Sequence, residues 1–223
     1  MEENATMKYK AILFDMDGVL IESEWLMRDT AIQSLAEHGV QAKHEDFLEF
    51  TGCGEDRFVG GVAEKYGLTY TFAMKERAYD FFGERVLEET DVPEGVKEML
   101  ETLHARGLKM AVCSAADRRK VMYNLLAVGV TEDKFGAFIT GSDVERKKPF
   151  PDIYLMGAER LGVEPKDCLV IEDAISGIQA AHAAGMDAVG VPTTFSKEEL
   201  MERVHPEYML NHIKELADLP ELN

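Results

Sequence analysis

The sequence predicts an α/β fold, a Rossmann-like parallel sheet with helices on both faces, together with an inserted all-helical domain. Two patterns carry this prediction. Over residues 93–223, short apolar runs alternate with stretches of helical periodicity, which is typical of a parallel sheet. Residues 23–92, by contrast, show helical spacing and few β-branched runs. We therefore expect a core domain formed by residues 1–22 and 93–223, and a helical cap domain over residues 23–92.

The first predicted strand, residues 11–14, is followed at once by two aspartates, Asp15 and Asp17, and then by Gly18. A short uninterrupted apolar run is typical of a strand buried on both faces. Side chains two apart on a strand point the same way, so both carboxylates are expected in one space at the carboxyl end of the sheet, where such folds bind ligands. The alternative is that the two acids only mark a strand end, as Asp often does.

The cap is expected to hold three helices, because apolar residues recur at helical spacing between glycines that end each stretch. The first helix ends near Gly39, the second ends at Gly67, and the third spans residues 72–87.

The core beyond the cap is expected to alternate strands and helices. The strands are expected over residues 108–113, 135–141, 168–173 and 187–191. The helices are expected between Pro93 and Gly107, and over residues 118–128, 152–161 and 175–185. The tail, residues 206–223, is expected to add one short strand and a last helix.

Composition excludes several classes of protein. The chain has 42 acidic against 24 basic residues and a formal charge of -18, so it repels nucleic acid, and any phosphate site must carry its own cations. The cysteines (Cys53, Cys113 and Cys168) have neither zinc-site nor disulfide-framework spacing, which fits a reducing compartment. No apolar run resembles a signal peptide or reaches membrane-spanning length. We expect a cytoplasmic protein with no membrane partner, and a monomer by default.

Polar residues gather just past the predicted strand ends, which share one edge in a parallel sheet. They are Asp15, Asp17, Ser114, Lys147, Lys148, Glu172 and Asp173. Unit charges about 4 Å apart repel by roughly 4 kcal/mol at an effective dielectric near 20, so four carboxylates there need a counter-ion. Ligands that are all oxygen suit a hard cation, with Mg²⁺ the first choice. Ser114 and one lysine remain as donors to an anion, which together indicates phosphoryl transfer. One of two adjacent lysines is usually only solvated, and we expect this of Lys147.

The motifs resemble those of the haloacid dehalogenase (HAD) superfamily, in the β-phosphoglucomutase-like branch whose helical cap follows the first strand. Four motifs match in order: DMDGVL at residues 15–20, Ser114 after a strand, Lys148 with Pro149, and Glu172 with Asp173. The resemblance covers essentially the whole chain and implies a HAD-like core.

The resemblance also implies a chemical role for the core residues. Asp15 would be the nucleophile that forms an aspartyl-phosphate, and Asp17 the general acid and then the base that activates water. Ser114 and Lys148 would hold the transferring phosphoryl oxygens. Relatives that cleave carbon–halogen or phosphonate bonds lack an aspartate at the second position, so Asp17 favours cleavage of a phosphate ester.

The same resemblance implies a metal site. Mg²⁺ would be held by Asp15, by the backbone carbonyl of Asp17, and by Asp173. Glu172 would lie close by or act through water.

The cap bears on the choice between a phosphatase and a mutase. The mutase's Lys-Gly-x-x-Arg stretch corresponds here to residues 51–55, with Thr51 in place of the lysine and Glu55 in place of the arginine. A mutase holds two phosphates and needs cations at both ends of its cleft. Its first-cap-helix histidine is Met27 here. We therefore expect a phosphatase acting on a small phosphorylated metabolite, with sugar phosphates among the candidates, and keep a β-phosphoglucomutase-type mutase as the alternative.

The residues expected to select the leaving group are Arg28, Gly52, Cys53, Arg57 and Ala115. A non-catalytic reading also stays open, because phosphoaspartyl receiver modules likewise place acids, a hydroxyl and a lysine at a sheet edge. Such a module would carry its acceptor aspartate on a middle strand, which here ends in a serine, and it has no helical insert.

Overall fold

The computed structural model describes residues 7–50 and 54–223, and its centre is a sheet of six parallel strands. The strands are β1 (Ala11–Phe14), β2 (Lys109–Cys113), β3 (Ala137–Ile139), β4 (Cys168–Glu172), β5 (Asp187–Gly190) and β6 (Tyr208–Met209). Their order across the sheet is β3-β2-β1-β4-β5-β6. β1 therefore lies between β2 and β4, with Phe14 opposite Val112 and Ile171. The predicted α/β fold is confirmed.

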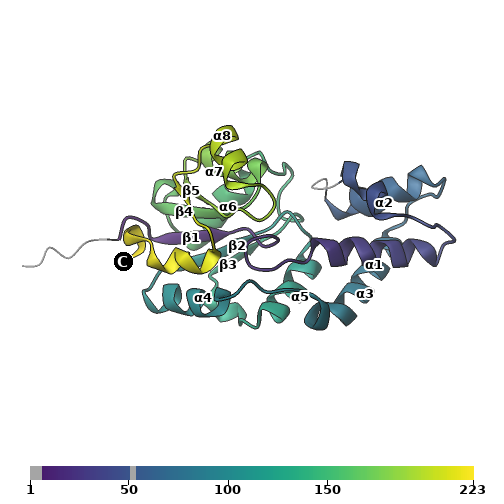
Figure 1. The fold of residues 1–223 in the computed structure, drawn as a ribbon, viewed down its shortest axis with the longest axis horizontal. Helices are drawn as coiled ribbons and strands as arrows, with labels where there is room; N and C mark the ends of the chain where they lie inside the picture. Colours follow the sequence, from purple (N-terminus) through teal and green to yellow (C-terminus); the bar gives the residue numbers. More distant parts are fainter. Residues whose placement is uncertain (1–6, 51–53) are drawn as a thin grey trace, which may run out of the picture.

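Helices cover both faces of the sheet, as Figure 1 shows. They are α4 (Val96–Ala105) and α5 (Arg118–Val128) on one face, and α6 (Asp152–Leu161), α7 (Ile175–Ala183) and α8 (Lys197–Arg203) on the other. The side chains of β1 alternate between these layers: Ile12 and Phe14 pack with α4 and α5, whereas Ala11 and Leu13 pack with α6 and α7. All four are fully buried, as expected for a strand covered on both faces.

The segment between β1 and α4 folds into helices with an apolar core of their own. They are α1 (Glu24–Ala36), the 3-10 helix η1 (His44–Phe50), α2 (Glu55–Lys65) and α3 (Phe72–Glu89). Leu26, Phe47 and Phe82 are among the buried side chains of this core. Figure 1 shows these helices beside the sheet, at the end toward which β1 runs. The three expected cap helices are present; the domain limits at 22/23 and 92/93 stay a prediction.

The C-terminal third differs from the sequence expectation in two places. Residues 197–203 form α8, which was not expected, and the expected last helix is the 3-10 helix η4 (Ile213–Asp218). The signal for α8 was present, because Ser196 and Glu199 form a capping box: the Glu199 N–H donates to Ser196 Oγ (3.2 Å), and the Ser196 N–H donates to Glu199 Oε2 (3.0 Å). The remaining short 3-10 helices are η2 (Glu132–Lys134), η3 (Pro165–Asp167) and η5 (Pro220–Leu222).

Two expectations from composition can be compared with the fold. Cys113 and Cys168 are buried free thiols, in agreement with their spacing, and Cys53 lies outside the described residues. Within residues 7–50 and 54–223, every helix is too short or too polar to cross a membrane.

Candidate active site

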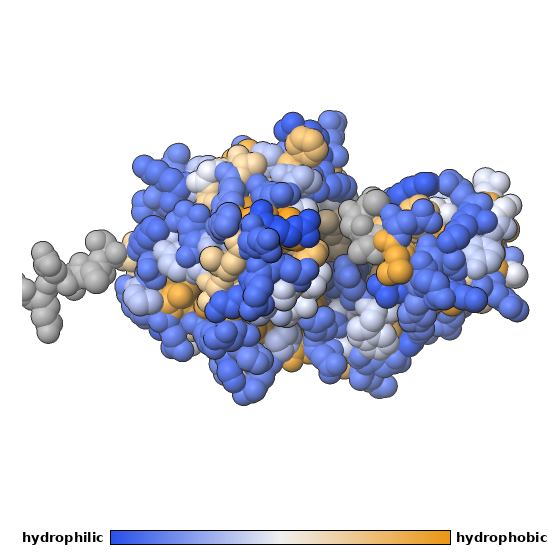
Figure 2. All heavy atoms as spheres, turned by 45° about the horizontal axis from the view of Figure 1, so that its top comes forward, coloured by the Kyte–Doolittle hydropathy of each residue, from blue (hydrophilic) through white to orange (hydrophobic). Residues whose placement is uncertain are grey.

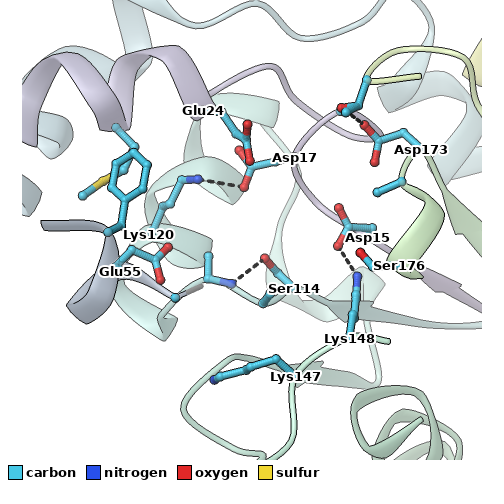
Figure 3. Close-up of a pocket in the computed structure, with 18 of the residues that line it drawn as sticks. Asp15, Asp17, Glu24, Glu55, Ser114, Lys120, Lys147, Lys148, Asp173 and Ser176 are labelled. Carbon is cyan, nitrogen blue, oxygen red and sulfur yellow. Dashed lines mark hydrogen bonds and ion pairs between the residues drawn. The ribbon is translucent and has the colours of Figure 1, made fainter. Parts of the chain in front are cut away.

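A cleft of about 390 Å³ opens between the carboxyl end of the sheet and the cap helices. Figure 2 shows it as a hollow between the two parts of the molecule, on a face that is mostly hydrophilic. All six residues expected to form the core of the site line it: Asp15, Asp17, Ser114, Lys148, Glu172 and Asp173. Figure 3 shows five of these labelled around one open space. The expectation that strand ends share one edge of the sheet therefore grouped residues correctly although they are up to 158 positions apart in the sequence (15 to 173).

Three carboxylates form a cluster in the cleft. Asp15, Glu172 and Asp173 each place an oxygen within 4.8 Å of the others. They meet because Asp15 follows β1, Glu172 is the last residue of β4, and Asp173 follows it, and the two strands are neighbours in the sheet. Burial, together with the Glu172 carboxylate, raises the pKa of Asp173 to about 7. Burial likewise raises the pKa of Asp15 well above its ordinary value, against the opposing effect of Lys148.

The cluster fits a hard divalent cation, because its donors are all oxygen and their mutual repulsion is only partly compensated. Asp17 was expected to hold the metal through its backbone carbonyl. Its carboxylate lies outside this group and accepts from Lys120 and Ser23.

Lys148 is the cation within the cluster. Its side chain is 8% exposed, and its Nζ lies 2.5 Å from Asp15 Oδ1 and 2.6 Å from Glu172 Oε1. Burial lowers the pKa of Lys148, but the two carboxylates outweigh it and raise the pKa above its ordinary value. Tyr154 Oη also donates to Glu172 Oε1 (2.7 Å), which fixes that carboxylate in place. Lys148 therefore stays charged and is held beside the expected nucleophile.

Asp17 is held by a donor from α5 and by one from the start of the cap. Lys120 Nζ donates to Asp17 Oδ2 at 2.8 Å, and Ser23 Oγ donates to Asp17 Oδ1. Asn124 Nδ2 in turn donates to Ser23 Oγ (2.9 Å). Lys120 is not among the predicted site residues. Its place four residues before Asn124 puts both on one face of the helix, but this spacing does not show what that face contacts.

Ser114 follows β2 and is 3% exposed. Its N–H donates to Ile139 O (3.0 Å), and its Oγ accepts from the Ala116 N–H (3.2 Å), so its hydroxyl hydrogen is available to a ligand. Lys147, which we expected to be merely solvated, is half-buried, lines the cleft, and donates to the carbonyl of Gly141. The expectation for Lys147 was wrong because its ammonium bonds to the backbone carbonyl of Gly141, just after β3, and does not extend into solvent.

Two threonines that we missed hold Asp173. Thr193 Oγ1 and Thr194 Oγ1 lie 3.0 and 2.5 Å from Asp173 Oδ2, and Thr193 Oγ1 also lies 2.6 Å from Gly18 O. They come just after β5, so the strand-end rule, applied to one more strand, would have found them. Gly18 has φ of +78°, and a Cβ there would collide with the Asp173 carboxylate.

The opposite side of the cleft, here called the cap wall, is formed by Met27, Arg28, Phe50, Glu55 and Phe58. Two of its polar atoms, Arg28 Nε and Glu55 Oε2, are buried and have no hydrogen-bond partner within the described part of the chain. Burial raises the pKa of Glu55 to about 7, although Lys120 opposes the rise.

The residues expected to select the leaving group are only partly brought together. Arg28 and Ala115 line the cleft. Arg57 is not among the lining residues; its guanidinium pairs with Glu64 (2.7 Å) and lies 5.0 Å from the centre of the Phe50 ring. Gly52 and Cys53 lie outside the described residues.

The sequence and the fold were compared with those of known proteins. A model of the haloacid dehalogenase-like hydrolase family matches residues 9–185. Protein SUPPRESSOR OF QUENCHING 1, chloroplastic, from Arabidopsis thaliana is 42% identical over 204 residues; the match covers 87% of this chain and 19% of that protein, so the chain spans about a fifth of its length. The phosphorylated carbohydrates phosphatase of Thermotoga maritima is 32% identical over 225 residues, covering 93% of this chain and 99% of that one. The crystal structure of CbbY from Rhodobacter sphaeroides shares the fold, with a TM-score of 0.82, 24% identity, and coverage of 96% and 99% of the two chains.

Proposed function

We propose that this chain, which belongs to the haloacid dehalogenase-like hydrolases, is a Mg²⁺-dependent phosphatase that cleaves a small phosphorylated metabolite through an aspartyl-phosphate on Asp15. The observation that carries the proposal is the cluster of Asp15, Glu172 and Asp173, with Lys148 Nζ 2.5 Å from Asp15 Oδ1. A relative named as a phosphatase of phosphorylated carbohydrates supports the substrate class.

The reaction takes place in two displacements. An oxygen of Asp15 attacks the phosphorus, the bond to the leaving oxygen breaks, and Asp17 gives that oxygen a proton. Asp17 then takes a proton from water, which attacks the phosphorus and breaks its bond to Asp15, releasing inorganic phosphate. Lys148 and Ser114 donate hydrogen bonds to the phosphoryl oxygens in both steps. A divalent cation bound by the three-acid cluster supplies positive charge that screens the phosphoryl group.

Lys120 and Ser23 act on this chemistry through Asp17. Both donate to the Asp17 carboxylate, so they fix its position on the side of the cleft from which the leaving group departs. General acid–base help of this type contributes roughly 10²–10⁴-fold to a rate, and depends on the proton donor lying within hydrogen-bond reach.

Hydrolysis, rather than transfer between two ends of one sugar, is supported by the cap wall. A mutase needs cations on that side to hold the second phosphate. The cap wall carries Arg28, but Glu55 adds a carboxylate to the same wall, 9% exposed and directed toward the cleft, which opposes the binding of a second phosphate there.

Phosphate release from para-nitrophenyl phosphate tests the proposal. We expect activity that requires Mg²⁺, is abolished by EDTA, and is lost in Asp15→Asn, which keeps the size of the side chain but is a far weaker nucleophile. Asp218→Asn, at an exposed carboxyl, is the matched control and should keep full activity. Activity that survives Asp15→Asn would refute the aspartyl-phosphate. Conversion of β-glucose 1-phosphate to glucose 6-phosphate, primed with the bisphosphate, would instead favour the mutase.

The cytoplasmic location and the monomeric state belong to the proposal as well. The location rests on composition, and one relative is named as chloroplastic; the monomeric state is the default expectation. Cell fractionation tests the first and size-exclusion chromatography with light scattering tests the second.

A further inference from the structure

Glu55 is a buried carboxylate that the proposed reaction does not use. It is the first residue of α2, its residue surface is 9% exposed, and its Oε2 has no hydrogen-bond partner among residues 7–50 and 54–223. Figure 3 shows the Glu55 carboxylate turned toward the space that Asp17 and Ser114 also face. A buried polar atom without a partner destabilises the fold, and such atoms are found where a ligand completes the bonding.

A structural role does not explain this burial. An acid in the first turn of a helix interacts favourably with the helix dipole, but it does so when exposed to solvent too, so this interaction does not require burial. Lys120 is the cation that acts on Glu55, but its Nζ lies 2.8 Å from Asp17 Oδ2 and is therefore shared. The oxygen is thus left facing the cleft with an unused capacity to accept a hydrogen bond.

Arg28 supplies the complementary group on the same wall. Its Nε is buried and has no partner within the described part of the chain, so it offers a donor where Glu55 offers an acceptor. Phe50 and Phe58 line the wall between polar groups and provide apolar surface for carbon-bound hydrogens. A hydroxyl both donates and accepts, so a polyhydroxylated alcohol satisfies both side chains. A second anionic group could accept from Arg28 but would be repelled by the Glu55 carboxylate and would leave its Oε2 without a donor.

We propose that Glu55 sets the specificity of the cleft: it selects phosphate monoesters whose leaving group is a neutral, polyhydroxylated alcohol and rejects those with a second anionic group at the far end. The inference rests on the proposed phosphatase function of the same cleft. Rejection comes from like-charge repulsion in a buried site, and selection comes from the hydrogen bond that the substrate hydroxyl donates to Glu55 Oε2.

Three six-carbon sugar 6-phosphates test this selection. Glucose 6-phosphate carries a hydroxyl at C1, 6-phosphogluconate carries a carboxylate at C1, and glucosamine 6-phosphate carries an amino group at C2, next to that end. We expect kcat/KM at pH 8 with Mg²⁺ to be at least about tenfold lower for 6-phosphogluconate than for glucose 6-phosphate. In Glu55→Gln this ratio should fall to within about threefold, because the charge that repels the carboxylate is gone. A wild-type preference for glucosamine 6-phosphate would identify a cationic donor, instead of a hydroxyl, as the group that Glu55 binds.

Glu64→Gln is the matched control, because Glu64 lies on the same helix but is exposed and pairs with Arg57. It should leave the ratio unchanged. Thermal unfolding without substrate gives a second measurement: Glu55→Gln should raise the melting temperature at pH 8, since it removes a buried charge, whereas a structural role for Glu55 predicts a lower one.

Para-nitrophenyl phosphate separates the two proposals. If wild-type protein with Mg²⁺ releases no phosphate from it, the proposed function fails and the selection by Glu55 fails with it. If it is hydrolysed, but the hexose ratio is the same in Glu55→Gln as in wild type, or no hexose phosphate is turned over, the phosphatase stands and the role of Glu55 is refuted.

Discussion

Replacing Asp173 by Asn should stabilise the metal-free protein at neutral and alkaline pH. Asp173 is 3% exposed, lies near two other carboxylates, and has a pKa raised from 3.8 to about 7 in the folded chain. Asparagine keeps the geometry, because its side-chain oxygen still accepts from the hydroxyls of Thr193 and Thr194. Its amide then lies toward the neighbouring carboxylates, as a donor in place of a charge.

The expected size and pH range follow from the pKa change. Near pH 4 and below, Asp173 tends to hold its proton in the folded chain, and the stability that this provides is present. Between about pH 4 and pH 7 the unfolded chain loses the proton while the folded chain keeps it, so the wild-type free energy of unfolding falls as pH rises. A difference of about 3 pKa units corresponds to about 4 kcal/mol at pH 8, taken as an upper bound. Asp173→Asn does not titrate, so its free energy of unfolding should not show this decrease.

Urea unfolding in EDTA, from pH 4.5 to pH 8, measures the effect. We expect the advantage of Asp173→Asn over wild type to grow with pH and level off above pH 7, and Asp218→Asn, at an exposed site, to show no such trend. Mg²⁺ should reverse the order, because ligands that bind only the folded state stabilise it and the variant has lost one donor. A variant that is no more stable than wild type at pH 8 in EDTA would refute the view that the three acids destabilise the empty cluster.

Two further substitutions test the site and the fold. Lys120→Met removes the ammonium 2.8 Å from Asp17 and should lower kcat for para-nitrophenyl phosphate by roughly ten- to a hundredfold with little change in KM, because Lys120 positions the proton donor. Lys97→Met, at an exposed site, is the control. An unchanged kcat in Lys120→Met would contradict this role. Ser196→Ala should lower the free energy of unfolding, measured with urea, by about 1 kcal/mol, because it removes the capping box of α8. Thr71→Ala, at an N-cap without a side-chain hydrogen bond, should lower it by less. An equal decrease in the two variants would show that the capping box does not stabilise the fold.

The order of strands and helices could be predicted because each element shows its own spacing of apolar residues along the sequence. The run at residues 11–14 is apolar at every position and lies buried on both faces, and the glycines at 67 and 129 end helices where expected. The strand-end rule then placed Asp15, Ser114 and Asp173 at one edge without any knowledge of distances.

Residues on the helices that flank the cleft could not be assigned to the site from local sequence patterns. Lys120 lies beside two arginines, and only the packing of α5 shows which of the three reaches Asp17. Arg57 was expected in the cleft, but its helical position turns it to Glu64, and the glutamate two residues earlier lines the cleft instead. A shift of two residues on a helix changes the face by about 200°, so the choice depends on how α2 sits against the sheet.

The sequence alone determined the fold class, the order of the elements and the acids at the sheet edge, because strand periodicity and chain order fix which residues follow which strand. Tertiary structure alone decided which side chains reach the site from the helices: the lysine on Asp17 and the unpartnered Glu55. These contacts depend on the angle at which helices and loops meet, and that angle is set by packing across the whole molecule.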